Sequence, residues 1–435
     1  MNKPTLSKVA CVLFVFCAAT AIASPAQLLT TLHSFTGSPS DPANPYVPAG
    51  LVQATDGNFY GTTYFGGAHY GGTVFKITPS GTLTTLYSFC SQANCTDGEN
   101  PGAGLVQGTD GNFYGTTVQG GVTNGDNCDG CGTVFKITPS GTLTTLHAFA
   151  GNPTEGQWPL APLVQGTDGN FYGTTEAGGG SLNCGAGASG CGTVFRITPG
   201  GTLTTLHSFQ ATDGLLPVAG LVQATDGNFY GTTQYGGTVT NCSEITGTCG
   251  TVFKVTPQGA LTTLYSFDSS DGAYPQAGLL QASDGNFYGT TREGGASQNC
   301  SYQTYGCGTV FRITPEGTLT TLHSFTGTDG SYPYAGLVQA TDGNFYGTTY
   351  NGDLAYCHDG CGTVFKITSG GTLTTLHSFA GIARYGIDGA NPSAGLVQAT
   401  DGNFYGTTYG GGAHNDGTVF RLVTARACIV CPSVE

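Results

Sequence analysis

The sequence predicts an all-β fold, a seven-bladed β-propeller of four-stranded antiparallel blades that the N-terminal strand closes into a ring. Three observations support this prediction. The chain has 73 Gly and only 9% charged residues, a composition that favours short strands and tight turns over helices. The last copy of an internal repeat is incomplete, and its missing part stands at the start of the chain. The phrase DGNFYGTT occurs seven times, beginning at Asp56, Asp110, Asp168, Asp226, Asp284, Asp342 and Asp401.

The first residues are typical of a secretory signal peptide. Lys3 and Lys8 precede an apolar run from Val9 to Ala23 that ends in small residues. This pattern predicts cleavage, and the run is too short to span a bilayer comfortably. We therefore expect a secreted protein, extracellular or periplasmic, without membrane insertion. The expected division of the chain is a signal peptide over 1–23, the propeller over 24–426 and a C-terminal tail over 427–435.

Each repeat contains four strand signals in the same order, which the first unit illustrates. Residues 50–63, GLVQATDGNFYGTT, form two strands joined by a turn at Asp56-Gly57, because Gly tolerates positive φ. A third strand, GTVFKIT, covers Gly72 to Thr78, and a fourth, TLTTLYSF, covers Thr82 to Phe89 after a second tight turn. Four such strands cannot bury an apolar face alone, so the units must pack against one another.

The two ends of the chain distinguish a ring from a linear array. The last unit stops after its third strand, Gly417 to Leu422, and a fourth-strand sequence stands at Leu28 to Phe35. A ring unites these fragments in one blade, whereas a linear solenoid would need capping repeats and would leave open edges. We therefore expect the N-terminal strand to complete the last blade.

The repeat unit begins with GTVFKITPSGTLTTLHSF, continues through a segment that contains DG and a Pro, and ends with AGLVQATDGNFYGTT. This unit resembles the GloVer (gloeo/verruco) tandem-repeat family of exported bacterial proteins. The resemblance covers essentially the whole mature chain. It implies an extracellular or surface protein built from repeats, and it supplies no catalytic residues. The chain ends in CIVCPSVE, which departs from members of the family that carry a C-terminal anchor.

Successive connections in a four-stranded meander alternate between the two edges of a propeller. The turns at 54–58 and 78–82 and their counterparts share one edge, the turn rim, and are nearly identical in all units. The loops at 66–72 and 90–104 and their counterparts share the other edge, the variable rim, where length and sequence differ. Binding residues concentrate in variable loops on a rigid scaffold, so the variable rim is the candidate functional face.

The two rims also differ in the charged residues that they carry. Most acidic residues outside the repeated turns fall in the variable loops. An acidic rim disfavours nucleic acid and polyanionic glycans, which need a basic footprint, and permits cations, neutral sugars or basic protein surfaces. Most basic residues instead occupy one position of the third strand, where each should pair weakly with its own turn Asp. These are Lys76, Lys136, Arg196, Lys254, Arg312, Lys366 and Arg421.

Aromatic residues accompany the carboxylates in the variable loops. Rigid rings beside hydrogen-bonding groups suit a sugar face and a protein interface equally. The alternative is that the rings only cover blade ends and fill the mouth of the channel. The candidate ligand-binding residues are Trp158, Tyr274, Tyr332, Tyr235, Tyr305, Tyr356, Asp213, Asp271 and Asp329.

The cysteines indicate disulfides formed in an oxidising compartment. After signal removal their number is even, and in five units a pair lies between the second and third strands with its second Cys directly before GTVF. A zinc site would need two more ligands near a pair, so we expect no metal. The pairs are Cys128/Cys131, Cys184/Cys191, Cys242/Cys249, Cys300/Cys307 and Cys357/Cys361, with Cys90/Cys95 and Cys428/Cys431 outside these loops.

Catalytic signals are weak. Five His recur on the fourth strand, where Tyr87 and Tyr265 replace them in other units, which indicates packing rather than ligation. The sequence contains no HExxH, GxSxG, Walker or EF-hand motif. We therefore expect a monomeric, non-catalytic recognition protein without a cofactor, whose ligand is a neutral carbohydrate or a protein surface. A glycoside hydrolase or lyase that uses rim carboxylates and a structural or adhesive surface protein are the alternatives.

Overall fold

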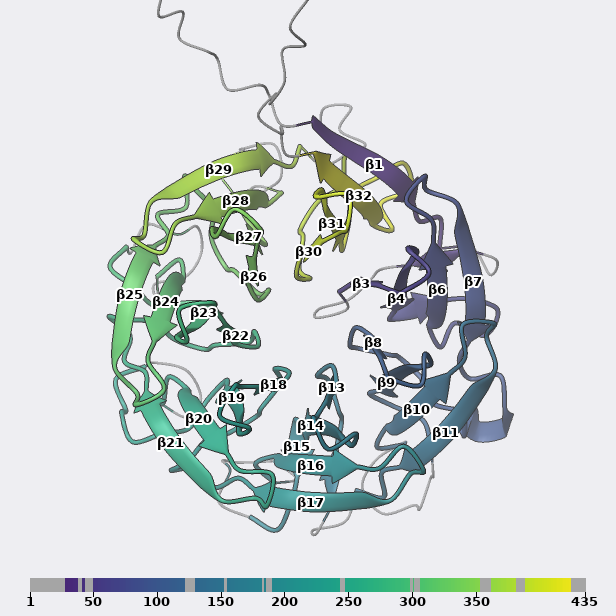
Figure 1. The fold of residues 1–435 in the computed structure, drawn as a ribbon, viewed down its shortest axis with the longest axis horizontal. Coiled ribbons are helices and arrows are strands. Elements are labelled where there is room, and N and C mark those ends of the chain that lie inside the picture. The colour runs from purple at the N-terminus through teal and green to yellow at the C-terminus, as the bar shows by residue number, and fades with distance from the viewer. Residues whose placement is uncertain are drawn as a thin grey trace, which may run out of the picture.

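The chain forms seven four-stranded antiparallel sheets, which are the blades of a closed ring (Figure 1). The predicted seven-bladed β-propeller is confirmed. The signal peptide and the tail predicted at the two ends lie outside the described residues. The computed structural model describes residues 28–37, 41–43, 50–121, 130–151, 155–181, 184, 190–242, 247–297, 300, 306–352, 361–380 and 388–423.

Each blade runs from a short first strand beside the central axis to a fourth strand on the outer wall (Figure 1). The first strands are β3 (Val52–Gln53), β8 (Val106–Gln107), β13 (Val164–Gln165), β18 (Val222–Gln223), β22 (Leu280–Gln281), β26 (Val338–Gln339) and β30 (Val397–Gln398). The second strands are β4 (Phe59–Thr63), β9 (Phe113–Thr117), β14 (Phe171–Thr175), β19 (Phe229–Thr233), β23 (Phe287–Thr291), β27 (Phe345–Thr349) and β31 (Phe404–Thr408).

The two outer strands of each blade are longer on average. The third strands are β6 (Thr73–Ile77), β10 (Thr133–Ile137), β16 (Thr193–Ile197), β20 (Thr251–Val255), β24 (Thr309–Ile313), β28 (Thr363–Ile367) and β32 (Thr418–Val423). The fourth strands are β7 (Leu83–Ser88), β11 (Leu143–Ala148), β17 (Leu203–Ser208), β21 (Leu261–Ser266), β25 (Leu319–Ser324), β29 (Leu373–Ser378) and β1 (Leu28–Ser34). Two short ladders on the variable rim pair β2 (Pro42–Ala43) with β5 (Phe65–Gly66) and β12 (Gly156–Gln157) with β15 (Ala177–Gly178), and a 3-10 turn, η1, covers Ala93–Cys95.

The N-terminal strand closes the ring as predicted. β1 pairs antiparallel with β32 from Leu28↔Val423 to Ser34↔Thr418, so the last blade has the order β1-β32-β31-β30. Figure 1 shows β1 on the outer wall, where the other blades place their own fourth strand. One blade is therefore assembled from both ends of the chain.

The repeated phrase DGNFYGTT builds the turn rim and the contacts between blades. In the first blade the Asp56 carboxylate accepts hydrogen bonds from the Asn58 backbone N–H at 3.0 Å, the Asn58 amide at 2.8 Å and the Tyr60 hydroxyl at 2.9 Å. The Tyr60 ring then stacks on Phe113 of the next blade, with ring centroids 4.0 Å apart. The same stack recurs at the last junction, between Tyr405 and Phe59. Each such ring pair contributes about 0.5–1.5 kcal/mol beyond its buried area.

Glutamines of the first strands form a second set of contacts between blades. Gln107 accepts a hydrogen bond from the Thr55 backbone N–H of the preceding blade at 3.0 Å. The pattern continues around the ring and ends where Gln53 accepts from Thr400 N–H at 2.8 Å. The first and last repeats are thus joined at the channel as well as at the outer wall.

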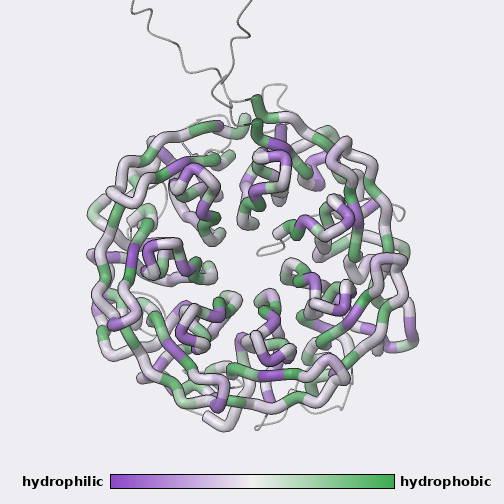
Figure 2. Tube along the Cα trace, in the orientation of Figure 1, coloured by the Kyte–Doolittle hydropathy of each residue, from purple (hydrophilic) through white to green (hydrophobic). Residues whose placement is uncertain are grey.

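The hydrophobic core is distributed over the junctions between blades rather than gathered at one centre. Figure 2 shows hydrophobic residues throughout all seven blades. One buried cluster contains Val74 and Phe89 of the first blade with Phe113 and Phe135 of the second. The Gly of each FYGTT is needed for this packing, because a Cβ on Gly61 would lie 2.8 Å from the Phe75 ring.

Each turn aspartate feels the charge of the third-strand cation of its own blade, and among the described residues the predicted ion pair is formed by Lys136, whose Nζ lies 2.9 Å from Asp110 Oδ2. Burial alone would raise the pKa of each turn Asp, but hydrogen bonds from the turn, together with the third-strand cation, outweigh burial and hold the pKa below its ordinary value. This holds for Asp56, Asp110, Asp168, Asp226, Asp284, Asp342 and Asp401.

Candidate functional site

In the six connections between blades that follow β7, β11, β17, β21, β25 and β29, one described residue adopts a left-handed conformation directly before a proline. Outside glycine this conformation costs about 1 kcal/mol or more. Two hydrogen bonds hold it: Trp158 N–H donates to the Cys131 carbonyl at 2.9 Å, and Glu176 N–H donates to the Trp158 carbonyl at 3.0 Å. The φ values are +53° to +58° at Asn100, Trp158, Leu216, Tyr274, Tyr332 and Asn391.

These bonds fasten each blade to the next at the variable rim. Cys131 lies two residues before the third strand of its blade, and Glu176 directly follows the second strand of the next blade. The carbonyl at this place is a fixed part of the junction, and the bond does not depend on a cysteine side chain, since Gly71 accepts from Asn100 N–H at 2.8 Å in the first blade. In the second to seventh blades the residue after the second strand is held in the same way, from Val118 to Tyr409.

A cavity of about 570 Å³ occupies the mouth of the central channel on the variable rim. Residues that follow the second strands of six blades line it, and the connections on either side of the remaining fifth blade contribute Gln276 and Tyr334, so the pocket lies on the propeller axis. Six lining residues directly follow a second strand: Tyr64, Val118, Glu176, Gln234, Tyr350 and Tyr409. The others are Gln119 and five residues of the connections between blades, Trp158, Leu160, Val218, Gln276 and Tyr334.

The tyrosines and the tryptophan occupy different parts of the pocket wall. Tyr350, Tyr409 and Tyr64 follow the second strands β27, β31 and β4 of three successive blades, and Tyr334 lies 5.1 Å from Tyr350, centroid to centroid. Trp158 and Glu176 belong to the side of the ring that carries β14 and β15, which Figure 1 places across the channel from β27 and β31. A ligand in the pocket would therefore lie between tyrosines on one side and tryptophan with polar groups on the other.

The pocket has little net charge. Glu176 is a lining carboxylate, and burial raises its pKa. Arg292 follows β23 at the position equivalent to Glu176, but its guanidinium lies 3.2 Å from the fully buried Glu293 carboxylate and 5.6 Å from the centroid of the Tyr334 ring. The positive charge is thus paired within the wall. The remaining polar lining consists of hydroxyl and amide groups that both donate and accept hydrogen bonds.

A second cavity of about 300 Å³ continues along the channel. The segments that lead into the first strands line it, and many of these residues are glycines. Gln276 and Tyr334 line both cavities. These two side chains therefore form the boundary between the mouth pocket and the channel.

Of the predicted binding residues, Trp158 lies in the pocket. Tyr274 and Tyr332 are buried, with 1% and 8% of their surface exposed. Tyr235 packs against Tyr274 at 5.1 Å and is not among the lining residues. Tyr305 and Tyr356 lie outside the described residues.

The predicted carboxylates lie toward the outer wall, where each bonds to a fourth-strand residue. His207 lies 3.1 Å from Asp213 and His323 lies 2.8 Å from Asp329, and the Tyr265 hydroxyl donates to Asp271. Each carboxylate also accepts a backbone N–H of its own connection, as Asp213 does from Gln210 at 2.7 Å. These aspartates fix the connections between blades, and the structure does not bring them to the pocket.

The sequence places Tyr64, Tyr350 and Tyr409 among the aromatic residues of the variable loops, but none of the nine candidate residues directly follows a second strand. The residues that do so carried a usable signal: the position after FYGTT differs from blade to blade beside a phrase that does not change. It reads Tyr, Val, Glu, Gln, Arg, Tyr and Tyr in chain order, from Tyr64 to Tyr409. A variable position next to an invariant strand end is where a repeat scaffold can change its ligand without changing its packing.

The disulfides staple the variable rim. Cys90–Cys95, Cys184–Cys191, Cys242–Cys249 and Cys300–Cys307 are bonded as predicted. Cys131 and Cys361 are disulfide-bonded too, and their predicted partners, Cys128 and Cys357, lie outside the described residues. The Cys428/Cys431 pair also lies outside them. These bonds indicate an oxidising compartment.

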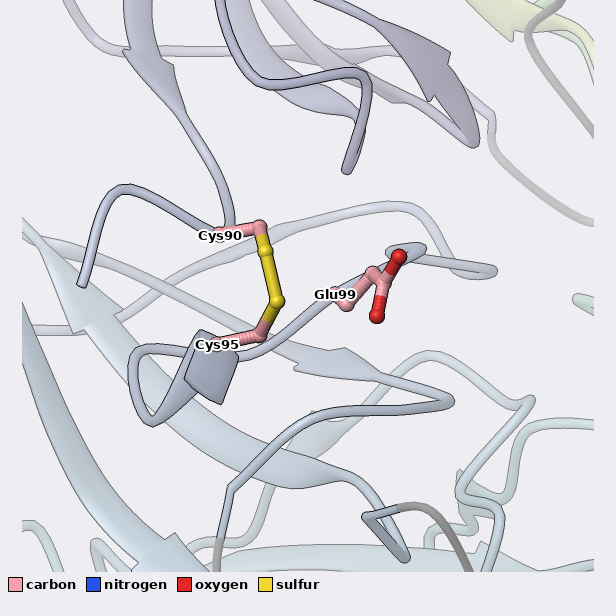
Figure 3. Close-up of side chains that lie close together, drawn as sticks. All are labelled: Cys90, Cys95 and Glu99. Atoms are coloured by element: carbon pink, nitrogen blue, oxygen red, sulfur yellow. A yellow bond between two sulfur atoms is a disulfide. The ribbon is translucent and has the colours of Figure 1, made fainter. Parts of the chain in front are cut away.

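One cluster of metal-ligand type occurs among the described residues: Cys90, Cys95 and Glu99. Figure 3 shows the two sulfurs joined to each other, with the Glu99 carboxylate beside them. A disulfide offers no thiolate to a metal, so in its oxidised form this cluster is a covalent cross-link of the loop and not a metal site. In the part of the chain that the structure describes, no helix is long and apolar enough to cross a membrane.

The fold and the pocket define a repeat-built seven-bladed propeller with a ligand-sized cavity on its axis. Matches to the model of the Gloeobacter/Verrucomicrobia repeat cover residues 19–238, 180–301 and 239–430. The chain therefore belongs to this repeat family, and the resemblance seen in the repeat sequence is confirmed. No curated protein matches the chain.

Solved structures share the fold at low sequence identity. The extracellular domain of a protein described as a hybrid two-component system from B. thetaiotaomicron is 13% identical, with a TM-score of 0.54, and the match covers 91% of this chain and 41% of that one. A gluconolactonase from Xanthomonas campestris is 12% identical, with a TM-score of 0.40, covering 75% and 89%. The aldose sugar dehydrogenase of Streptomyces coelicolor is 11% identical, with a TM-score of 0.43, covering 92% and 99%. At these identities the likeness shows the fold alone.

Proposed function

We propose that this is a secreted, non-catalytic recognition protein whose axial pocket binds a neutral carbohydrate. The observation that carries the proposal is the composition of the pocket wall: one tryptophan and four tyrosines, accompanied by the amides of Gln119, Gln234 and Gln276. Aromatic rings stack against the apolar faces of a sugar, while amides donate to and accept from its hydroxyls. A mainly apolar wall with a few polar groups is typical of small-ligand sites.

The charges support a neutral ligand over a charged one. Arg292 is paired with Glu293, so it offers no free cation to an anionic sugar. Glu176 is a single lining carboxylate whose charged form is disfavoured by burial. An uncharged ligand with many hydroxyls therefore fits better than a polyanion or a strongly cationic ligand.

Glycoside cleavage is the main alternative, and the described wall supports it less. Hydrolases of this kind use two carboxyl groups about 5–10 Å apart. Among the described residues that line the pocket, Glu176 is the one carboxylate. Chain shortening of a bound oligosaccharide would favour the hydrolase, and binding without shortening favours recognition.

The protein contains one tryptophan, and it lines the pocket. Trp158 emission is therefore a direct report of occupancy. Titration of the mature protein with neutral oligosaccharides should shift or quench this emission in a saturable way for at least one sugar, while chromatography of the same mixtures should show intact ligand. A flat emission signal across gluco-, xylo-, manno- and galacto-oligosaccharides would contradict the proposal.

Replacing the tryptophan tests its contribution with a substitution the fold already uses. Asn100 and Asn391 occupy the equivalent position in other blades and donate to Tyr64 O and Tyr350 O, each at 2.9 Å. Trp158→Asn should therefore fold, and calorimetric titration should show about tenfold or greater loss of affinity from the lost stacking. Tyr70→Asn is the control, because Tyr70 is 65% exposed on the same rim, outside the pocket, at φ +61°. It should bind as the wild type does.

A further inference from the structure

The mouth pocket is enclosed around its circumference. The first repeat contributes Tyr64 and the last contributes Tyr409. Between them, every blade but the fifth adds a residue after its second strand, and Gln276 and Tyr334 line the pocket on either side of the fifth. A pocket on the axis of a closed ring opens along that axis. A ligand therefore reaches the inner wall by entering end-on, whereas a long chain lying across the rim would reach it only by bending sharply.

The pocket also has a defined floor. Gln276 and Tyr334 line both the mouth pocket and the channel below it. Below them the segments that lead into the first strands pack closely against their neighbours: a Cβ on Gly104 would lie 2.8 Å from the Gly50 carbonyl oxygen, and one on Gly278 would lie 3.0 Å from the Gly220 carbonyl oxygen. The wall of this section is therefore closely packed backbone, whose arrangement cannot change without moving whole blades.

Tyr334 is held in place from two sides. Its ring meets Tyr350 edge-on at 5.1 Å, and the Arg292 guanidinium lies over it at 5.6 Å from the centroid. Arg292 is in turn fixed by the fully buried Glu293. Tyr334 is also the largest residue at its position in the six connections that follow β7 to β29, where the others are Gly102, Leu160, Val218, Gln276 and Ser393.

We infer that the protein recognises the end of a carbohydrate chain, which enters the mouth pocket along the propeller axis and stops against Tyr334 and Gln276. The inference rests on the proposed carbohydrate-binding function and adds the part of the ligand that is read. Tyr334 then limits how many sugar units the pocket accepts, and the rings of Trp158 and the tyrosines hold the terminal units.

A chain-length series tests the floor. With wild-type protein, Trp158 emission should show affinity rising with oligosaccharide length and then reaching a plateau. Tyr334→Ser introduces the residue that another connection has at the equivalent position, Ser393. The change removes the ring between the two cavities and should move the plateau to a longer oligosaccharide. Tyr334→Phe keeps the ring and should leave the plateau in place. Tyr334→Gln, which copies Gln276, is the second variant if Tyr334→Ser does not fold. An unchanged plateau in the folded variant would overturn the inference.

The number of chain ends provides an independent test on the wild-type protein. A neutral polysaccharide of the sugar that binds best is compared before and after partial hydrolysis, at equal mass. End recognition predicts that the amount of protein bound rises in proportion to the reducing ends measured in each sample. If the amount of bound protein follows the mass of polysaccharide and not the number of its ends, end recognition is refuted while carbohydrate binding stands. If no oligosaccharide changes the Trp158 emission at all, the proposed function fails and the inference fails with it.

Discussion

Glu176 occupies a position that the next two blades fill with Gln234 and Arg292. Burial raises the pKa of Glu176. At pH values between the ordinary pKa of Glu and this raised pKa, the folded protein therefore binds more protons than the unfolded chain. The stability associated with a protonated Glu176 is therefore complete at low pH and is lost as the pH rises through that range.

Glu176→Gln should remove this dependence. We expect the variant to melt at a higher temperature than the wild type near neutral pH, with the difference vanishing below about pH 4, where the wild-type carboxyl is protonated in both states. Differential scanning fluorimetry across pH measures both curves. A variant that melts lower than the wild type at neutral pH would mean that the carboxylate is stabilised by a partner rather than destabilised by burial.

Residues at one repeat position do not all serve one purpose, and this limits prediction from sequence. Trp158, Tyr274 and Tyr332 share the left-handed position before proline, yet Trp158 lines the pocket while the two tyrosines are buried. Tyr274 is held by the Tyr235 ring of the preceding blade, whereas the equivalent neighbour of Trp158 is Gln119. The orientation of a ring therefore depends on a partner in another repeat, which repeat alignment alone does not reveal.

The turn of the DGN phrase is the most regular element of the molecule. Asp226 accepts hydrogen bonds from Asn228 N–H at 3.0 Å, the Asn228 amide at 2.7 Å and the Tyr230 hydroxyl at 2.9 Å. Burial alone would raise the pKa of Asp226, but these bonds and Lys254 lower it overall. Its contribution to stability is therefore present above the ordinary pKa of Asp and is lost as the pH falls through the lowered value.

Asp226→Asn should place amide donors against the donors of Asn228 and Tyr230. We expect the free energy of unfolding to fall by about 1 kcal/mol at neutral pH, given the partial exposure of the turn. Denaturant titration should show that the difference from the wild type shrinks on acidification. Gln258→Ser, an exposed change in another turn of the same rim, serves as the control and should have little effect. A loss that does not depend on pH would contradict the assigned role of the carboxylate.

Strand order was predictable from sequence, and strand detail was not. The four strand signals of each repeat appear in the expected order. The fourth strand, however, shifts register between Val74 and Phe75 of its partner, which leaves Leu86 as a bulge, and the same shift recurs in other blades. The first strands are only two residues long, because the preceding AGL segment lines the channel instead of pairing. Tertiary packing decides both features, and local periodicity does not contain that information.

The closed ring was predictable because the incomplete units at the two ends add up to one blade. The structure shows β1 on β32, with Leu28 opposite Val423. β32 would otherwise be an open edge with unpaired backbone groups. The axial pocket could not be located in the same way, since it arises only when strand ends and connections of separate blades meet around an axis.

Removing the closing strand should weaken the whole molecule. A chain that begins at Phe35 lacks β1 and should melt at a lower temperature and associate through the open edge of β32, as measured by scanning fluorimetry and size-exclusion chromatography. The control moves residues 28–34 to the C-terminal side of Val423 through the TPSGT turn of the first blade. This permuted chain keeps the strand and should behave as the wild type does. Equal melting of the truncated chain and the permuted chain would show that β1 is dispensable.

The junctions between blades use the same stack, the same glutamine bond and the same left-handed link at successive positions around the ring. Neighbouring repeats are therefore close to interchangeable parts, each carrying its own side chain at the channel mouth. Exchange of one repeat for another at a matching position would keep the number of blades and these junctions, and would give the pocket a new lining residue. A lineage of these proteins can diversify what it captures by reordering modules that it already has.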